Sequence, residues 1–376
     1  MIDWRIGGGL VLGAAGLARG ELTLHAGRIG PAHSPRGFDA DGCWVLPGII
    51  DIHGDAHERA VQPRPGVDFP LDIAWRDSAA QMLANGITTA YLGVTLSWEP
   101  GLRSLATFRA LMAASRPAMP DLRIHLRFEA DHLDALPDAL DALRSGAVQL
   151  LGFNDHTPGI ARKAADPLAL VKYAERAHVT TAEIARLAAA AMARRAELPA
   201  ARAALAQAAR DAGAAMLSHD DATLADRAIF RALGASICEF PMAEEVAADA
   251  RAAGEHVVMG APNVVRGGSH LGWASAAPLA ERGLVTILAS DYHWPALFEA
   301  PFVMMRRGVL DVPAAWALVS GNPADALGLA DRGGLAPGMR GDVLVVQGAP
   351  EAARLQAVFC QGQLVWCAPD AAARIG

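Results

Sequence analysis

From residue 45 to residue 292, short apolar runs alternate with longer segments whose apolar residues recur at helical spacing. The apolar runs are Val45–Ile52, Ile87–Leu92, Leu122–Phe128, Val148–Phe153, Ala214–Ser218, Ala235–Phe240, His256–Met259 and Val285–Ala289. Helices are predicted between them, among others over Asp72–Ala84, Leu102–Ala114, Pro137–Arg144, Thr181–Arg194 and Pro199–Ala212. Eight strand–helix units of this kind predict an α/β fold with a closed (β/α)8 barrel. An open doubly wound sheet is the alternative, but no glycine fingerprint follows an early strand.

Both ends of the chain have a different pattern, with short strands and turns and no helical period. Strands are predicted near the N-terminus at Leu10–Leu12 and Glu21–Leu24. Beyond a helix predicted over Val312–Leu327, strands are predicted at Asp342–Val346, Ala357–Cys360 and Leu364–Cys367. We therefore expect residues 1–45 and 332–376 to form one composite small β domain beside a barrel made of residues 46–331.

The composition suits a large folded enzyme rather than a nucleic-acid or membrane protein. The 376 residues are 52% hydrophobic and 19% charged, which is enough to fill a sizeable core. The net charge of -7 disfavours a general anionic partner, so an anionic substrate needs a local cluster of arginines. The four cysteines lack CxxC spacing, and no signal-peptide or membrane-spanning pattern is evident. We expect buried free thiols and a cytoplasmic location.

Polar side chains stand where five of the apolar runs stop. His53 and Asp55 end the first run two residues apart, so both point to one face of a strand. The other positions are Glu129, His156, His219 and Asp291. Each alone is more commonly a structural residue or a helix cap; Asp220 and Asp221, for example, could cap the next helix. Together, at the carboxyl ends of barrel strands, they predict a catalytic rim.

Imidazoles and carboxylates of this kind bind zinc, manganese or iron. We expect two divalent ions, zinc first, with His53, Asp55 and Asp291 on one ion and His156 and His219 on the other. Glu129 would bridge the two ions. Such a pair lowers the pKa of a water molecule, and Asp291 is placed to accept its proton as the catalytic base.

The PGIID-type first strand, the β-rich ends and the terminal Asp291 resemble the amidohydrolase superfamily. Many members bridge their metals with a carboxylated lysine. Only two lysines occur here, Lys163 and Lys172, and neither ends a strand. The resemblance therefore implies that a glutamate takes this role, and Glu129 is the best candidate.

A more specific resemblance covers nearly the whole chain, in order. It is to the ribose methylphosphonate triphosphate diphosphatase family of phosphonate metabolism. It is carried by His53–Asp55, Pro63–Val67, Gly86–Thr89, His125–Glu129, Asp155–Gly159, Ser218–Thr223, Glu239–Pro241, Gly260–His270 and Ser290–Tyr292. That family hydrolyses a ribose 5-triphosphate bearing a 1-methylphosphonate to the 5-phosphate and diphosphate, and the resemblance implies the same reaction here.

A polyphosphate needs cationic and backbone donors beyond the metal ions. The matched segments offer the substrate-binding candidates Arg64, Arg127, Arg266, Gly267, Gly268 and His270. The chain departs from the family at Gly54, where Thr is usual, and at His57, His293 and Trp294, which crowd the substrate side.

Two alternatives stay open. One is a C–N hydrolase, a deaminase or cyclic amidase, on the same scaffold. The other is a non-catalytic metal-bound subunit. We expect a small-molecule phosphorylated ribose substrate, no nucleic-acid or membrane partner, and either a monomer or a homo-oligomer.

Overall fold

A computed structural model describes residues 2–33, 35–268 and 276–376. Its centre is a sheet of eight parallel strands in sequence order. The strands are β8 (Ile49–Gly54), β9 (Ile87–Leu96), β10 (Asp121–Glu129), β11 (Leu150–Asn154), β12 (Ala215–His219), β13 (Ile237–Glu239), β14 (His256–Gly260) and β15 (Ile287–Ala289). Each strand matches one predicted apolar run. The sheet is nearly closed into a barrel, so the predicted (β/α)8 fold is confirmed.

The seam between the first and last strands is held by backbone and side-chain bonds. The N–H of Asp291 donates to the carbonyl of His53 at 2.9 Å, and the N–H of Asp55 donates to the carbonyl of Asp291 at 3.0 Å. Below them, the buried carboxylate of Asp51 accepts the N–H of Ser290 at 3.0 Å and its hydroxyl at 2.6 Å. These contacts fix the register of β8 against β15.

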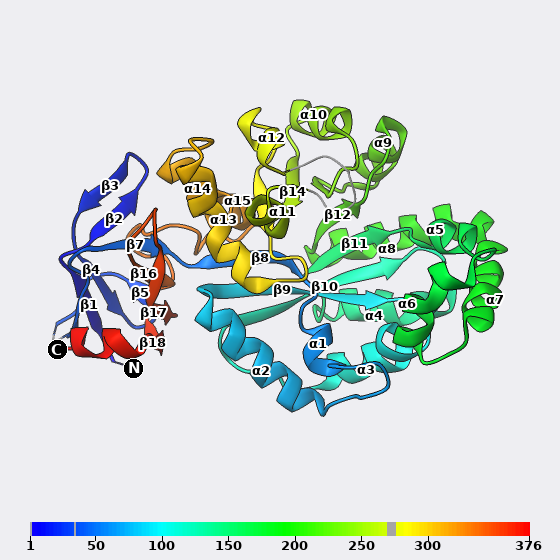
Figure 1. The fold of residues 1–376 in the computed structure, drawn as a ribbon, viewed down its shortest axis with the longest axis horizontal. Helices are drawn as coiled ribbons and strands as arrows, with labels where there is room; N and C mark the ends of the chain where they lie inside the picture. The colour runs from blue at the N-terminus through cyan, green and yellow to red at the C-terminus, as the bar shows by residue number, and fades with distance from the viewer. Residues whose placement is uncertain (1, 34, 269–275) are drawn as a thin grey trace.

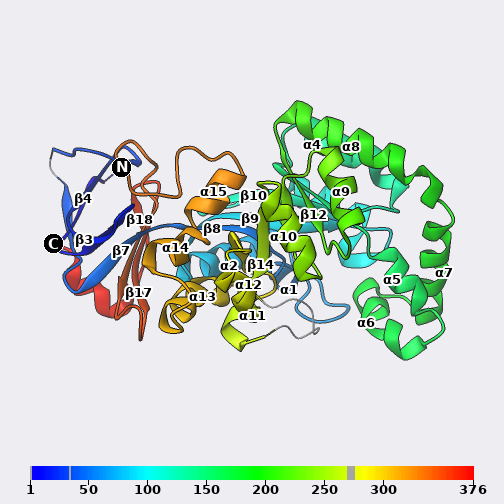
Figure 2. The same ribbon diagram turned by 90° about the horizontal axis from the view of Figure 1, so that it is seen from above.

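Helices cover the outside of the barrel (Figures 1 and 2). They are α1 (Glu58–Val61), α2 (Leu71–Ala84), α3 (Leu105–Ala113), α4 (Leu136–Arg144), α5 (Thr157–Arg162), α6 (Pro167–Ala177), α7 (Thr181–Met192), α8 (Leu198–Ala212), α9 (Leu224–Leu233), α10 (Glu244–Ala252), α11 (Ala261–Arg266), α12 (Ala276–Glu281) and α13 (Trp294–Arg306). The three helices α5–α7 form an excursion between β11 and α8. They lie at the end of the molecule opposite the chain termini, and β10 and β11 point towards them (Figure 1).

One segment that was predicted as a single helix forms two separate helices. The segment expected as a single helix over 312–327 divides into α14 (Val312–Ala317) and α15 (Gly321–Ala326). Ser320 leaves helical geometry at φ -136° and ψ -78°, and Pro323 lacks the N–H that a continuous helix would need.

Strands from both ends of the chain build two further sheets. One has the order β5-β4-β1-β6, from β1 (Trp4–Gly7), β4 (Leu22–His25), β5 (Arg28–Ile29) and β6 (Arg36–Asp39). The other has the order β18-β17-β16-β7-β2-β3, from β2 (Leu10–Gly13), β3 (Gly16–Arg19), β7 (Cys43–Pro47), β16 (Val343–Gln347), β17 (Arg354–Cys360) and β18 (Gln363–Cys367). Their side chains form a core of their own, in which Trp4, Phe38 and Phe359 meet edge to face.

The run Val45–Ile52 is not one strand, because the chain passes from β7 in the terminal sheet to β8 in the barrel at Gly48. A Cβ at Gly48 would lie 2.3 Å from Oγ1 of Thr88, so only glycine fits this crossing. Since β7 extends to Pro47, the division of the chain at residues 45 and 332 stays a prediction.

The four cysteines are free thiols; Cys43, Cys238 and Cys360 are buried, and Cys367 is half-buried. Within the described ranges, every helix is too short or too polar to cross a bilayer.

Candidate metal centre

Three predicted side chains meet beside the barrel seam. His53 lies next to the last residue of β8, Asp55 follows that strand, and Asp291 follows β15. One ligand atom from each lies within 4.8 Å of the other two. We call these the first donor group. Asp291 has a left-handed backbone at φ 55°, which is unusual for a residue other than glycine. Because its N–H and carbonyl both bond to the β8 end, barrel closure itself positions this group.

A second donor group consists of His156, His219 and Asp220. Oδ2 of Asp220 lies 3.5 Å from Nε2 of His219 and 3.9 Å from Nε2 of His156. The interpretation of Asp220 as a helix cap is wrong, because Thr223 caps α9 in a capping box with Asp226. The two donor groups separate His53 from His156 and His219, and Asp220 adds an oxygen donor to the second group. The assignment of these side chains to two ions stays a prediction.

Glu239, which ends β13, contacts both donor groups. Its carboxylate is fully buried, with Oε1 2.8 Å from Nδ1 of His53 and Oε2 2.7 Å from Nδ1 of His219. Sequence reasoning placed Glu239 in a matched segment but gave it no role. A carboxylate at the end of a barrel strand was the available signal.

His125 also lies beneath the first group. It is fully buried, its ring meets that of His53 edge to face at 5.1 Å, and neither of its nitrogens has a hydrogen-bond partner in the described part of the chain.

Glu129 is at the end of β10, as predicted, but lies in neither donor group. Its Oε1 accepts the N–H of His156 at 2.6 Å and that of Thr157 at 3.2 Å, and its Oε2 lies 2.9 Å from Nδ1 of His156. The carboxylate thus holds the His156 loop and ring. The bridging role stays a prediction, and it requires Glu129 to exchange some of these contacts for metal ions.

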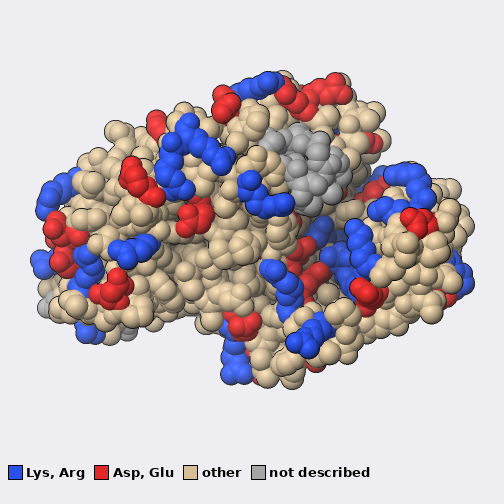
Figure 3. Space-filling view, viewed as in Figure 1, with Lys and Arg blue, Asp and Glu red and all other residues tan. Residues whose placement is uncertain are grey.

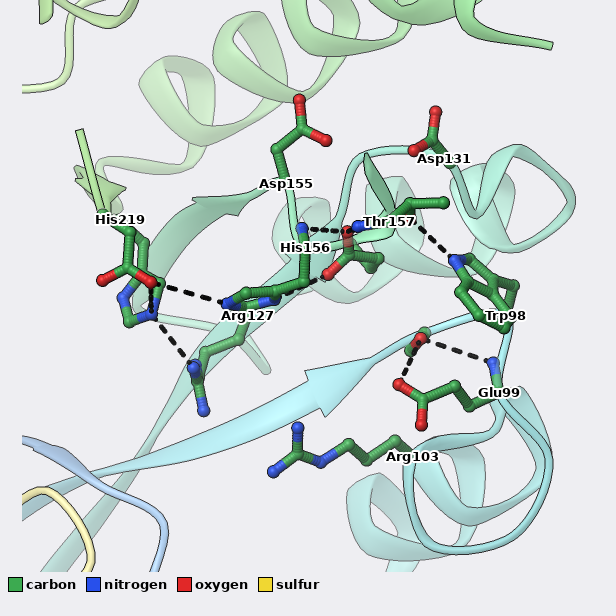
Figure 4. Close-up of polar contacts among 12 residues, drawn as sticks. Trp98, Glu99, Arg103, Arg127, Asp131, Asp155, His156, Thr157 and His219 are labelled. Atoms are coloured by element: carbon green, nitrogen blue, oxygen red, sulfur yellow. Dashed lines mark hydrogen bonds and ion pairs between the residues drawn. The ribbon is translucent and has the colours of Figure 1, made fainter. Parts of the chain in front are cut away.

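Arg127 contacts both donor groups, and Figure 4 shows its contact with His219. Its Nη1 donates to Oδ2 of Asp55 at 3.3 Å, and its Nη2 lies 3.3 Å from Nε2 of His219. Its Nε has no partner among the described residues. The guanidinium is almost fully buried, with its side chain 7% exposed, so it is a strong local positive charge within the donor set.

The donor side chains themselves suit cation binding, whereas the Arg127 guanidinium beside them opposes it. Burial lowers the pKa of His219 to about 3 and that of His53 well below its ordinary value, so both imidazoles are neutral ligands at pH 7. Burial and the nearby charge of Asp55 raise the pKa of Asp291 to about 7. Burial would also raise the pKa of Glu129, but His156 and the hydrogen bonds outweigh it and lower this pKa to about 2. Neutral nitrogen donors and crowded carboxylates therefore fit divalent metal ions.

The remaining substrate candidates are less enclosed. Arg64 is exposed and forms an isolated bridge with Val67. Arg266, exposed at the end of α11, donates to the hydroxyl of Tyr292 at 3.3 Å. His270 lies outside the described residues.

The backbone N–H groups proposed for phosphate binding at Gly267 and Gly268 already have an acceptor. Both donate to the carbonyl of Asn263, at 3.1 and 3.0 Å, and close the C-terminus of α11. Gly267 has the left-handed φ of 86° expected for that cap.

The departures from the family pattern have structural reasons. A Cβ at Gly54 would lie 2.7 Å from Oδ2 of Asp51 and 2.8 Å from Oγ of Ser290, with the indole nitrogen of buried Trp294 3.2 Å away. His57 is buried and stacks on Trp75 at 5.7 Å. It therefore serves packing and belongs to neither donor group. His293 is exposed at the start of α13.

Ion pairs and hydrogen bonds stabilise the chain on both sides of His156. Asp155, adjacent to His156, turns away from His156 and His219 (Figure 4). Its carboxylate pairs with Arg195 at 2.7 Å and with Arg202 at 2.8 Å. The indole N–H of Trp98 donates to the hydroxyl of Thr157 at 2.9 Å. The space-filling view shows a hollow beside α5–α7 that contains both acidic and basic side chains (Figure 3).

Comparison with known proteins gives a relative that matches nearly the whole chain. The chain is 33% identical over 367 residues to the α-D-ribose 1-methylphosphonate 5-triphosphate diphosphatase of Escherichia coli (strain K12), covering 95% of this chain and 97% of that protein. No family model matches the chain.

Solved structures share the fold at low identity. A molinate hydrolase has a TM-score of 0.62 at 15% identity, covering 97% of this chain and 94% of the other. The zinc-containing N-acyl-D-glutamate deacylase of Bordetella bronchiseptica has a TM-score of 0.59 at 16% identity, covering 97% and 96%. These similarities establish the architecture alone.

Proposed function

Because the chain belongs to the α-D-ribose 1-methylphosphonate 5-triphosphate diphosphatase family of the amidohydrolase superfamily, we propose that it is a metal-dependent diphosphatase of phosphonate degradation. Its substrate is ribose 1-methylphosphonate 5-triphosphate, and its products are the 5-phosphate and diphosphate. The observation that carries the proposal is the pair of donor groups at the barrel mouth, in a chain that aligns with this relative over almost its full length. The free cysteines support a cytoplasmic setting.

Two zinc ions are proposed. His53, Asp55 and Asp291 would hold one, and His156 and His219, with Asp220, the other. Ions bound there supply positive charge to phosphoryl oxygens and lower the pKa of a water molecule.

Two side chains of the protein would contribute the rest of the chemistry: one transfers protons, and the other stabilises negative charge on the phosphates. Asp291, which belongs to the first donor group at the end of the last barrel strand, is suited to take a proton from the attacking water and to release it to the departing oxygen. Arg127, with a planar guanidinium at the junction of the two groups, is suited to donate to phosphoryl oxygens as charge moves onto the diphosphate.

The test follows hydrolysis of ribose 1-methylphosphonate 5-triphosphate by the zinc-loaded enzyme with ³¹P NMR. We expect diphosphate and the 5-phosphate as the first products. Chelation should abolish turnover, and restored zinc should recover it. A matched control is Asp138→Asn, which changes a half-buried carboxylate on α4 that pairs with Arg109 and lies outside both donor groups. Stepwise release of single phosphates, or hydrolysis of cyclic amides without diphosphate formation, would reject the proposal.

A further inference from the structure

One buried carboxylate serves both donor groups. Glu239 is 0% exposed, and each of its two oxygens bonds to a different imidazole. His53 belongs to the first donor group and His219 to the second. The two imidazole rings are stacked 5.7 Å apart and only 16° from parallel, as expected for rings held by one planar carboxylate.

This contact determines which ring nitrogen can bind a metal. An ionised carboxylate only accepts hydrogen bonds, so Nδ1 of each ring must carry the proton. The remaining lone pair is then on Nε2 in both rings. Nε2 of His219 lies 3.5 Å from Oδ2 of Asp220 in the second group. The nitrogen that keeps its lone pair is therefore the one directed at the donor group.

We propose that Glu239 is a positioning residue that sets the tautomer of His53 and His219 together and thereby couples the two metal sites. This inference rests on the proposed function for its two ions, but its evidence is the tautomer and the metal content rather than turnover. A single change at Glu239 should therefore affect metal binding by residues that lie on different strands, β8 and β12.

The first test uses the metal-free wild-type protein, labelled with ¹⁵N-histidine. Long-range ¹H–¹⁵N spectra distinguish an Nδ1–H from an Nε2–H imidazole, and His53→Gln and His219→Gln variants assign the signals. We expect both rings to be Nδ1–H tautomers. An Nε2–H tautomer at either ring would overturn the proposal without any Glu239 variant.

The second test is Glu239→Gln. A glutamine offers one acceptor oxygen and one donor NH₂, so it can keep one ring in the Nδ1–H form but forces the other to accept at Nδ1 and carry its proton on Nε2. We expect one histidine signal to change tautomer, and one of two ions to bind about 10- to 100-fold more weakly. Bound zinc, measured after dialysis against limiting metal, should fall from two ions towards one.

Asp342→Asn is the matched control, because Asp342 is a buried carboxylate that pairs with Arg340 at 2.8 Å, just before β16 and outside both donor groups. It should lower thermal stability but keep both tautomers and the metal content. If Glu239→Gln binds two ions as tightly as the wild type, the coupling is refuted. If the tautomers and metal content behave as expected but the triphosphate is not hydrolysed, the proposed function fails while this inference stands.

Discussion

Arg227→Met tests whether a buried ion cluster supports the loop that carries the second donor group. Arg227 on α9 is fully buried, and Ser218 and Asp221, two of its partners, flank His219 and Asp220. The guanidinium contacts Oδ2 of Asp221 at 3.2 Å and Oε2 of Glu255 at 2.9 Å. Methionine has a similar shape but no charge and no donors, so the packing is largely kept while the electrostatic partner is lost.

The loss of stability in Arg227→Met depends on which ion-pair partners of Arg227 are left without another cation or donor. Glu255 keeps a cation, because Arg231 bonds to it at 2.6 Å. Among the described residues, the carboxylate of Asp221 keeps only the hydroxyl of Ser218 and the weak donor of Cys238. Removing one member of a buried pair costs about 3–5 kcal/mol. With about 2.1 cal/mol/K of unfolding entropy per residue over 376 residues, that is a loss of about 4–6 °C in Tm.

The loss should grow with pH. Burial already raises the pKa of Asp221, and Arg227 opposes that rise. A carboxyl group whose pKa is raised on folding stabilises the fold below its ordinary value of 3.8, and this contribution is lost as the pH rises through the raised pKa. Without Arg227 the pKa of Asp221 rises further. The difference in unfolding free energy between variant and wild type therefore widens as the pH rises above the pKa that Asp221 has in the wild type.

Calorimetry of wild type, Arg227→Met, Asp221→Asn and the double variant at pH 5.5 and 8 measures the effect. Asp221→Asn should restore about 1–3 kcal/mol to the Arg227→Met protein through coupling within the pair. Additive losses, or a Tm change under 1 °C at both pH values, would show that the cluster does not hold this loop.

Four further changes test the site. Asp291→Asn should keep its metal and its fold but lose about 10²- to 10⁴-fold in kcat, and normal turnover would reject its role as the base. Glu129→Ala frees the His156 loop and should lower bound metal; unchanged stoichiometry by elemental analysis would reject its assignment as a metal ligand. Arg127→Met should lower kcat/KM for the triphosphate by about 10- to 100-fold through loss of a charged donor, and an unaltered kcat/KM would exclude phosphate contact. Gly54→Thr should cost about 1–3 kcal/mol by overpacking against Asp51, and unfolding midpoints equal to wild type would contradict the tight fit.

The barrel could be predicted from the sequence because every strand is a buried apolar run ended by turn or helix signals. The convergence of His53, Asp55, His156, His219 and Asp291 could be anticipated too, since parallel barrel strands bring their carboxyl ends to one rim. This reasoning fixes the rim on which a side chain lies, but not its hydrogen-bond partner there.

What was missed depends on contacts between distant strands. Glu239 ends a strand of three residues, and its contacts with His53 and His219 arise only when β8, β12 and β13 surround a common interior. The break between β7 and β8 at Gly48 depends on the close approach of Thr88, which no local pattern reveals. Asp220 was interpreted as a helix cap from its position before α9, but Thr223 is the residue that caps this helix.

The seam of the barrel has a consequence for biosynthesis. Asp55 and Asp291 follow the first and last barrel strands, and they come together where the backbones of these two strand ends are hydrogen-bonded. A nascent chain still lacking β15 therefore has no complete first donor group and cannot capture an ion there. Metal uptake at that position would mark the moment at which the ring of strands has closed.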